Sequence, residues 1–399
     1  MMNLHNDKQN FKDLIEIASN ESGISQDIIE KDYYVTLMLQ ELAQNQSETK
    51  AYFKGGTCLY KIYFPMKRFS EDIDLTVCVK NISNSKAKSN LKKVSEKYTC
   101  LDKDYNNPKN ENKKGSITQV YSYESMFDVP NDSLQRYEKV QVEATSFTIS
   151  EPIETNKIHA LLIDLLPQNI VEKVKAEYEM SSFLIKNITL ERIFCDKLLA
   201  AEFYAERNES FDVAKHIYDI VNMLNEPRIQ KMLNNQDLFI QNLSYKRIEE
   251  TLRIGSDLWN KPFCDFKLKD YISSLNFTTS FIDMQNKYVF SEKYKIPINE
   301  IQLKLNKLYD ILLSIDNKEQ MILKSNSFIN HIHEYNKDFI PQNCNNKNNI
   351  LEPTIADYVG DIVDEDNISE NINIPGYIDQ PMDIEQPLAP SDDFEIGDE

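Results

Sequence analysis

The chain has 399 residues, which is long enough for a sizeable core and, on length alone, for two domains. The formal net charge of −19 is unevenly placed, because residues 351–399 hold about fifteen acidic residues and no Lys or Arg. The remaining chain is close to balanced, so its charge does not exclude a nucleotide or nucleic-acid substrate.

Cysteine usage and hydropathy indicate the cellular compartment of the protein. The six cysteines are scattered without a C-x-x-C pair, which argues against a zinc site or disulfide framework and favours reduced thiols. The first ten residues are polar and lack a signal-peptide core. No apolar run approaches the ~20 residues that span a bilayer. We therefore expect a cytoplasmic protein without a membrane partner.

Two helices are predicted near the N-terminus. Apolar residues at helical spacing predict a short helix over 11–18, which Gly23 ends. Ser25 is a good N-cap for a second helix over 26–42. Within it, residues 30–34 read Glu-Lys-Asp-Tyr-Tyr. This pattern favours a helix whose charged residues face solvent and whose tyrosines are buried.

A glycine pair follows the first predicted strand, over 51–53. Gly55 and Gly56 permit positive φ and close backbone approach, and Thr57 follows them. A helix over 58–63 comes next, and its free N–H groups would face an anion. Lys61 lies about one turn into this helix.

Two aspartates follow on the next predicted strand, over 69–79. A period of two places Asp72 and Asp74 on one face and the apolar residues on the other, with Ser70 at the strand entrance. A glycine pair alone is more often a turn, and an Asp-x-Asp alone is common on surface strands. Together, between two apolar strands, they favour a phosphate and metal site.

Further strands are predicted beyond a lysine-rich surface helix over 83–98. The polar run 102–115 predicts a mobile loop, and residues 117–123 alternate like a strand. Another strand over 139–147 carries Glu143 among apolar residues. Glu143 either joins the two aspartates or is an exposed strand glutamate, and the pattern leaves both open.

From Ile158 the pattern is predicted to be helical. Thr189 caps a helix that runs to about residue 206, in which Lys197 borders the buried face. Lys215 and Asp219 are i,i+4 partners, and spacing alone favours a surface pair worth a few tenths of a kcal/mol.

Helices over 243–258 and 299–315 complete the predicted body. His331 and His333 have no third metal ligand spaced nearby, so we interpret them as ordinary. Beyond residue 338 the chain is Asn-rich and then acidic with several prolines, which predicts a disordered tail.

The block from Lys54 to Thr57 and from Arg68 to Leu75 closely resembles the AbiEii/AbiGii toxin family of nucleotidyltransferases. Other family motifs are similar to the segments 30–35, 140–143, 189–198 and 215–219, in family order. The resemblance covers about residues 11–224, and more weakly extends to 315. Two positions depart from the family pattern: Cys58 replaces a frequent serine, and Asp196 replaces a usual glutamate.

The resemblance implies an α+β fold with a small mixed-sheet nucleotidyltransferase core of the polymerase-beta type, flanked by helices. We expect this core with its N-terminal helices over 1–155, a helical C-terminal domain over 156–338 and the acidic tail over 339–399. The family acts as toxins of toxin–antitoxin and phage-defence systems.

The resemblance also implies a mechanism. A nucleoside monophosphate would pass from an NTP to a hydroxyl, with RNA such as tRNA as the favoured acceptor, a protein acceptor still open, and a cognate antitoxin as a partner. The implied metal ligands for Mg²⁺ are Asp72, Asp74 and Glu143, with Lys197 as a further catalytic group. The implied nucleotide-binding residues are Gly55, Gly56, Thr57, Lys61, Arg68, Ser70, Lys215 and Asp219.

A second hypothesis is of a different class. The chain would be a non-catalytic nucleotide-sensing or partner-binding module that works through its acidic tail. That tail would mimic nucleic acid, dock a basic partner or cover the substrate surface, or it would simply keep the protein soluble.

Overall fold

The two strands on either side of the glycine pair lie at the centre of a mixed β-sheet. The computed structural model describes residues 3–335 apart from 66, 71, 81, 97, 114, 128–137, 179 and 254. The predicted acidic tail lies outside these described residues. All of the described residues belong to one unit by their contacts.

Among the described residues, eight strands form this sheet, in the order β3-β5-β6-β2-β1-β8-β7, with β4 paired to β5. Strand β1 pairs antiparallel with β2 and parallel with β8, and β2 pairs parallel with β6. The strands are β1 (Ala51–Lys54), β2 (Ile73–Val77), β3 (Asp102–Lys103), β4 (Glu111–Lys113), β5 (Ser116–Ser122), β6 (Lys139–Thr145), β7 (Ile153–Ile158) and β8 (Phe183–Ile188).

Alternation along the central strands fixes which side chains face the core. Ile73, Leu75 and Val77 on β2 are fully buried, and so are Val140 and Val142 on β6. Because successive side chains on a strand point to opposite faces, the residues between them share the other face. The apolar half of the pattern therefore turns the intervening polar residues toward a common surface.

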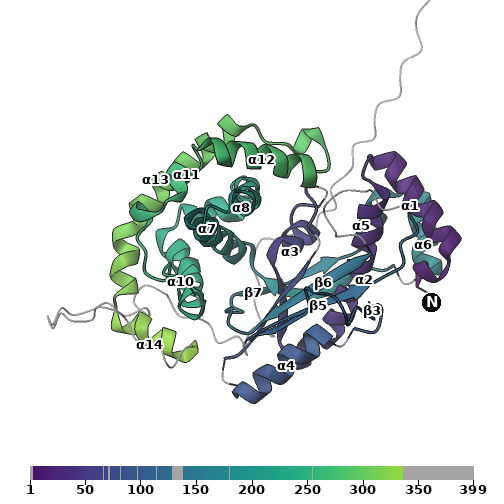
Figure 1. Cartoon of the computed structure of the whole chain (residues 1–399), viewed down its shortest axis with the longest axis horizontal. Coiled ribbons are helices and arrows are strands. Elements are labelled where there is room, and N and C mark those ends of the chain that lie inside the picture. The colour runs from purple at the N-terminus through teal and green to yellow at the C-terminus, as the bar shows by residue number, and fades with distance from the viewer. Residues whose placement is uncertain are drawn as a thin grey trace, which may run out of the picture. The chain divides into compact units, whose positions relative to one another are not determined.

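Helices cover the sheet and form the C-terminal half of the described chain (Figure 1). They are α1 (Lys8–Ser22), α2 (Gln26–Thr49), α3 (Gly55–Ile62), α4 (Asn84–Glu96), α5 (Leu161–Leu165), α6 (Gln168–Glu177), α7 (Leu190–Glu206), α8 (Ser210–Met223), α9 (Pro227–Leu233), α10 (Gln236–Leu252), α11 (Leu268–Tyr271), α12 (Leu275–Tyr288), α13 (Ile298–Leu323) and α14 (Asn326–Tyr335). This combination of a mixed sheet with a helical C-terminal region is the α+β fold that the sequence predicts.

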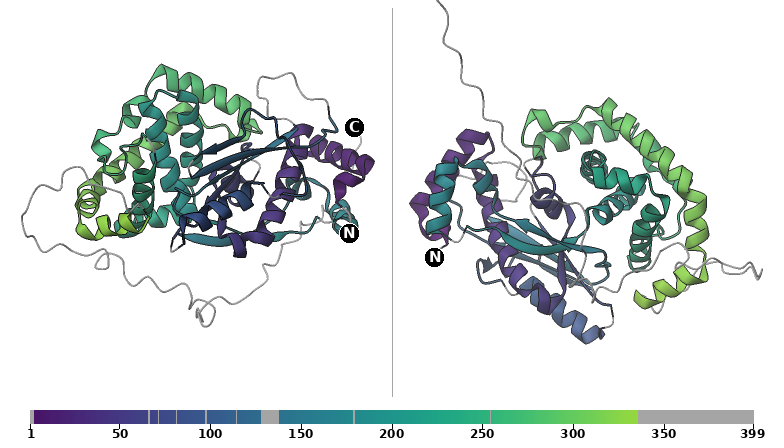
Figure 2. Two further views of the ribbon diagram at one scale, coloured as in Figure 1. Left: turned by 60° about the horizontal axis from the view of Figure 1, so that its bottom comes forward. Right: turned by 180° about the vertical axis from the view of Figure 1, so that it is seen from behind.

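The long helix α2 and the lysine-rich helix α4 both pack on the strands (Figure 2). Helix α2 contacts β2, β6 and β8, whereas α4 contacts β2, β5 and β6. Leu91 and Val94 of α4 are buried, so this polar helix has the apolar face that packing on a sheet requires.

Helices α7 and α8 pack side by side, and α12 and α13 lie outside α8 (Figure 1). Thr189 caps α7 as predicted, because its side chain accepts a hydrogen bond from the backbone N–H of Arg192. The buried stripe of α7 consists of Phe194, Leu198, Ala201 and Ala205. This pair of helices carries Lys197 and Asp219 into the interior.

Several predicted elements differ from the structure. The strand expected over 69–79 is confined to β2, so Asp72 precedes it. Strands β3 and β4 occupy parts of the predicted loop 102–115. Ser25 stands at the N-cap of α2 but makes no side-chain cap hydrogen bond.

The chain also does not become purely helical after Ile158. Strand β8 returns to the sheet between α6 and α7 and lies beside β1. Strand β7 spans the domain boundary predicted at 155 and β8 lies beyond it, yet both strands belong to this sheet. That domain division stays a prediction.

No helix among the described residues is both long enough and apolar enough to cross a membrane.

Candidate active site

A row of charged residues crosses the three central strands. Lys54 on β1 is paired in register with Asp74 on β2, and Asp74 is paired with Glu143 on β6. Residues directly opposite each other on neighbouring strands share a face and have Cβ atoms about 5 Å apart. The structure thus brings Glu143 next to Asp74, which is the first of the two alternatives left open for Glu143, and adds Lys54 beside them.

The glycine pair lies against this row. Gly55 has a φ of 79°, and a Cβ added there would lie 2.0 Å from Oδ2 of Asp74. A Cβ at Gly56 would lie 2.7 Å from Oγ of Ser70 and 3.3 Å from Nη2 of Arg68. A side chain at Gly55 would be strained by the positive φ and would displace Asp74, and one at Gly56 would displace the hydroxyl of Ser70, because the backbone of the turn approaches these polar side chains directly.

Helix α3 starts at the first glycine, so its unpaired backbone N–H groups open toward the same place. Thr57 is buried, and its hydroxyl donates to Oγ of Ser70 over 3.1 Å. Cys58, the position where the family often has serine, is fully buried, and burial raises the pKa of its thiol well above the ordinary value. A buried thiol of this kind is inert. The backbone of Gly55, Gly56 and Thr57 at the start of α3, which we call the cradle, does not depend on it.

Like charges crowd Asp74. Burial, together with the Glu143 and Asp72 carboxylates, raises the pKa of Asp74 to about 7, against the opposing effect of Lys54 and Lys197. Crowded carboxylates are unfavourable without a cation, and a cation near them favours the charged form. Carboxylate oxygens are also the ligands that Mg²⁺ prefers. The side chains present therefore fit a divalent cation.

Asp72 lies two residues before Asp74 and just outside β2, half-buried. No group of three or more His, Cys, Asp or Glu side chains within the described ranges is arranged to hold a metal ion. Mg²⁺ is commonly bound by one or two carboxylates together with substrate phosphates and water. The role of Asp72, Asp74 and Glu143 as metal ligands stays a prediction.

Asp219 of α8 is the centre of a second cluster, fully buried. Arg68 donates to it twice, from Nε to Oδ1 and from Nη2 to Oδ2, each over 2.8 Å. Nζ of Lys197 lies 2.9 Å from Oδ2, and the hydroxyl of Tyr60 donates to Oδ1 over 2.6 Å. Against the effect of burial, Arg68 and Lys197 hold the pKa of Asp219 well below its ordinary value.

This cluster borders the glycine turn. Nη2 of Arg68 approaches Gly56, and the guanidinium lies over the ring of Tyr60 on α3 at 4.7 Å. The charge of Lys197 also acts on Asp74. The structure thus joins the predicted residues Arg68, Lys197 and Asp219 in one ion-paired cluster beside the cradle.

Lys61 is directed elsewhere. Its ammonium lies 2.8 Å from Oδ1 of Asp32 on α2, and it also donates to the hydroxyl of Thr36 and the carbonyl oxygen of His159. Asp32 in turn accepts from the backbone N–H of Leu161. These contacts tie α3 to α2 and α5, so Lys61 has a structural position in this arrangement.

Lys215 differs from its predicted pairing. Nζ of Lys215 donates to Asp212 over 3.2 Å, whereas Asp219 is held by Arg68, Lys197 and Tyr60. The expected i,i+4 contact between Lys215 and Asp219 was therefore wrong. The competing partners of Asp219 come from elements distant in the sequence, which spacing along one helix does not reveal.

The predicted solvated face of α2 was also wrong. Glu30 and Lys31 are only 1% and 3% exposed, although the neighbouring tyrosines are buried as expected. Glu30 accepts from the hydroxyl of Ser125 and the backbone N–H of Met126. Lys31 lies over the ring of Phe69, which immediately precedes Ser70.

A third buried charge network lies between α7 and α10, and sequence reasoning missed it. Arg192 donates to Asp196 over 2.7 Å and lies 2.6 Å from Glu249, which also binds Lys246. Against the effect of burial, Lys246, Arg192 and Lys54 lower the pKa of Glu249. Asp196, the departure from the family pattern, thus belongs to this network, which extends to Lys54. In the sequence, the one feature that indicated a functional place for any member of this network was the position of Lys54 beside the glycine pair.

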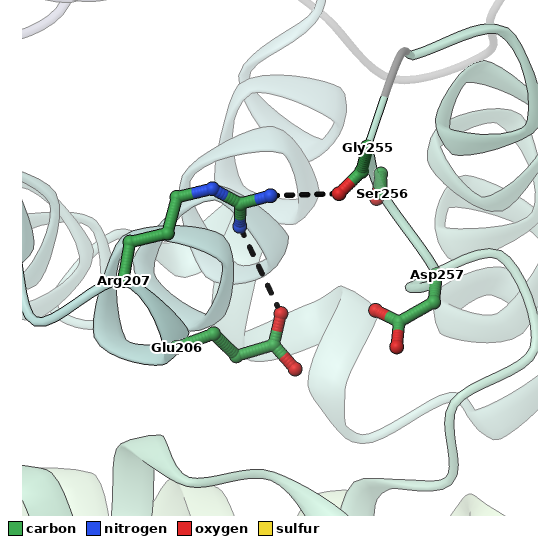
Figure 3. Close-up of a pocket in the computed structure, with 5 residues that line it drawn as sticks. All are labelled: Glu206, Arg207, Gly255, Ser256 and Asp257. Atoms are coloured by element: carbon green, nitrogen blue, oxygen red, sulfur yellow. Dashed lines mark hydrogen bonds and ion pairs between the residues drawn. The ribbon is translucent and has the colours of Figure 1, made fainter.

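An open depression of about 560 Å³ lies apart from these residues. Its lining is Glu206, Arg207, Gly255, Ser256 and Asp257. Figure 3 shows Arg207 directed at the carbonyl oxygen of Gly255, to which it donates over 2.7 Å, and at Glu206. None of the predicted site residues lines this depression, so it carries no part of the site described above.

The sequence over residues 37–270 matches a protein family described as "Nucleotidyl transferase AbiEii toxin, Type IV TA system". This chain belongs to the AbiEii nucleotidyltransferase toxin family. The matched residues include the cradle, both aspartates, Glu143 and the Asp219 cluster. The AbiEii chain is accordingly a nucleotidyltransferase of a type IV toxin–antitoxin family.

Among solved structures, the AbiEii chain resembles MenT4, a nucleotidyltransferase toxin from Mycobacterium tuberculosis H37Rv. The sequences are 13% identical, and the superposition has a TM-score of 0.46 over 80% of this chain and 97% of that chain. A comparison with curated proteins found no match.

Proposed function

We propose that the chain transfers a nucleoside monophosphate from an NTP to a hydroxyl of an RNA acceptor, with tRNA as the favoured class, and that Mg²⁺ is its cofactor. The observation that carries this proposal is the row of Lys54, Asp74 and Glu143 beneath the glycine turn. A phosphate cradle next to two carboxylates is the arrangement that metal-assisted phosphoryl transfer needs.

In this proposal the triphosphate is held by the turn at Gly55, Gly56 and Thr57, where helix α3 begins. Asp74 and Glu143 hold the cation, and Asp72 is placed nearby to complete the site. When bound, Mg²⁺ would supply charge neutralisation at the phosphates and Lewis-acid polarisation. Membership of a nucleotidyltransferase family supports a divalent cation in general, and the oxygen-only ligand set favours Mg²⁺.

Arg68 and Lys197 place positive charge beside the cradle, and Asp219 fixes both of them. Groups held in this way stabilise charge in the transition state without reorganising, which is where most of the rate enhancement in phosphoryl transfer arises. Ser70 is positioned through Thr57 at the entrance of the cradle. Lys61 is left out, because its donors are directed to Asp32, Thr36 and His159.

The toxin activity would follow from modification of an acceptor that the cell needs, and a cognate antitoxin would counter it. The family description names a type IV toxin–antitoxin system, which supports a cognate antitoxin. The same membership favours the enzyme over a non-catalytic sensing module.

Incubation of the protein with labelled NTPs, Mg²⁺ and either total RNA or protein lysate tests the proposal. We expect label in RNA, and at least about a 100-fold loss in the Asp72→Ala and Asp74→Ala variants. Asp13→Ala is the matched control, because Asp13 is an exposed aspartate on α1. Equal labelling by the parent and both site variants would refute the site, and label only in protein would refute the RNA acceptor.

A further inference from the structure

Aromatic rings and lysines from two helices meet beside the Asp219 cluster. We call this group the aromatic–lysine shelf; it consists of Phe211 and Lys215 on α8 and Lys287 and Tyr288 on α12. The rings of Phe211 and Tyr288 lie 5.9 Å apart at an angle of 58°. Both rings are half-buried, so part of each is open to solvent.

The lysines of the shelf lie over these rings. Nζ of Lys215 is 5.0 Å from the ring centre of Phe211 and 5.5 Å from that of Tyr288, and Nζ of Lys287 is 5.5 Å from that of Phe211. Their side chains are 30% and 40% exposed. Cation–π contacts are weak at sites as exposed as these, so the contacts of the ammonium groups with the rings do not prevent them from binding a phosphate.

The backbone connects the shelf directly to the proposed transfer site. The N–H of Phe69 donates to the carbonyl oxygen of Tyr288 over 2.8 Å, and Arg68 forms an antiparallel bridge with Val289. On the other side, Lys215 lies one helical turn before Asp219 on α8. The shelf therefore lies next to Arg68 and its partner Asp219, and it does not include the cradle itself.

We propose that the aromatic–lysine shelf binds single-stranded RNA and presents the acceptor hydroxyl to the transfer site. Aromatic rings stack with bases of any sequence, and neighbouring lysines contact the phosphates between them. This inference rests on the proposed function, because it assigns the acceptor of that same reaction to a surface.

Local acidic residues oppose this binding and set its strength. Lys215 is paired with Asp212, and Lys287 with Asp283 over 2.9 Å. These carboxylates are 40% and 48% exposed, and pairs as exposed as these contribute little. A polyanion with several phosphates can displace them, so we expect moderate affinity that falls steeply with salt.

The chain offers a matched control on another surface. Tyr105 is 79% exposed, and Nζ of Lys103 lies 5.3 Å from its ring centre. Like the shelf, this pair combines an aromatic ring with a lysine. It belongs to β3 and the segment that follows, and β3 is the edge strand at the end of the sheet farther from β1. If an exposed tyrosine under a lysine were sufficient for RNA binding, both places would contribute equally.

The test measures binding of a short, fluorescently labelled single-stranded RNA to the full chain without NTP or metal. We expect Phe211→Leu and Tyr288→Leu, which keep apolar packing but remove a stacking face, to weaken RNA binding about ten-fold each. Lys215→Gln should reduce the slope of log affinity against log salt by about 0.7. Tyr105→Leu should change neither quantity.

A second titration, with a fluorescent NTP analogue and Mg²⁺, uses the Phe211→Leu and Tyr288→Leu variants and should give unchanged affinity. Weaker NTP binding with unchanged RNA binding would overturn the inference, because the shelf would then hold the base of the nucleotide. Unchanged RNA binding in all shelf variants, or preferred binding of a peptide acceptor by the parent protein, would also overturn it. Melting temperatures within a few degrees of the parent verify that each variant is folded.

Failure of the proposed function would look different. If the parent transfers no label to any acceptor but binds RNA through the shelf, the transfer proposal fails and the shelf stands. If label is transferred to RNA and the shelf variants keep the parent KM for RNA, the shelf fails and the transfer proposal stands.

Discussion

Gly55 brings the turn that we propose to bind phosphate into contact with Asp74, a charged residue on β2. Its φ of 79° lies in the left-handed region, which side chains rarely adopt, and a Cβ there would collide with the carboxylate of Asp74. Two separate constraints, one on the backbone and one on space, therefore act at a single residue. They are separable by experiment, because Gly23 has a similar φ of 72° with open space around it.

We predict that Gly55→Ala abolishes nucleotide transfer, whereas Gly23→Ala leaves it near the parent level. Both variants should lose about 1 kcal/mol of stability through backbone strain, and Gly55→Ala should lose more because Asp74 must move. Chemical denaturation and the transfer assay measure the two effects. Equal loss of activity in both variants would show that backbone strain alone is responsible.

The carboxylate of Asp74 imposes a pH dependence on stability. Its pKa is about 7 in the folded protein and near the ordinary value of 3.8 in the unfolded chain. Between these values folding takes up a proton, so the free energy of unfolding falls as the pH rises toward 7. Above pH 7 the full penalty of the buried charge is present.

Asp74→Asn removes this penalty. We predict that the variant without metal is more stable than the parent at pH 8, by at least about 1 kcal/mol after allowance for the partial exposure of Asp74. The difference should shrink at pH 5.5. Thermal denaturation in a chelator at both pH values measures it, and a gain of equal size at both pH values would contradict the titration of Asp74.

At the scale of elements, Asp219 joins three segments that are distant in the sequence. Arg68 follows α3, Lys197 lies on α7, and Asp219 lies on α8, 151 residues from Arg68. Removing one partner of a buried ion pair leaves the others uncompensated. Asp219 therefore contributes both to the stability of the junction and to the placement of charge beside the cradle.

We predict that Asp219→Asn lowers the free energy of unfolding by about 3–5 kcal/mol, because Arg68 and Lys197 remain buried without their anion. Tyr60→Phe, which removes one hydrogen bond to the same carboxylate, should cost only about 1 kcal/mol. Denaturant titration of both variants provides the comparison. A loss below 1 kcal/mol for Asp219→Asn would mean that solvent already compensates the two cations.

The sequence predicted the elements around the cradle better than their pairing. The glycine pair, the following helix and the strand with Asp74 were all recognisable from local composition. The register of β1 with β2 was not recognisable, because α3 separates the two strands and no tight turn fixes which of their residues face each other. Lys54 was therefore missed as a member of the charged row.

Strand β8 was missed for another reason. Its six residues, Phe183–Ile188, form a short run that periodicity alone does not distinguish from a helix segment. Its strand conformation depends on pairing with β1 and β7, which are supplied by distant parts of the chain. The Asp219 cluster shows the same limit: spacing suggested Lys215 as the partner, and tertiary contacts supplied Arg68 and Lys197.

At the scale of the whole molecule, charge is divided between a nearly balanced body and an acidic tail. The tail is outside the described residues, and its composition alone carries the argument. Removal of its roughly fifteen acidic charges would change the net charge from −19 to about −4. A polyanionic acceptor is repelled by the first value much more strongly than by the second.

We predict that a chain ending at Ile350 binds single-stranded RNA several-fold more tightly than the full chain at low salt. The difference should disappear above about 0.5 M salt, where charges more than a few ångströms apart are screened. A full-length variant with Asn and Gln in place of the tail carboxylates should match the truncated chain, since charge and not the segment itself is responsible. RNA affinity that does not change with either alteration would leave the tail with no part in substrate access.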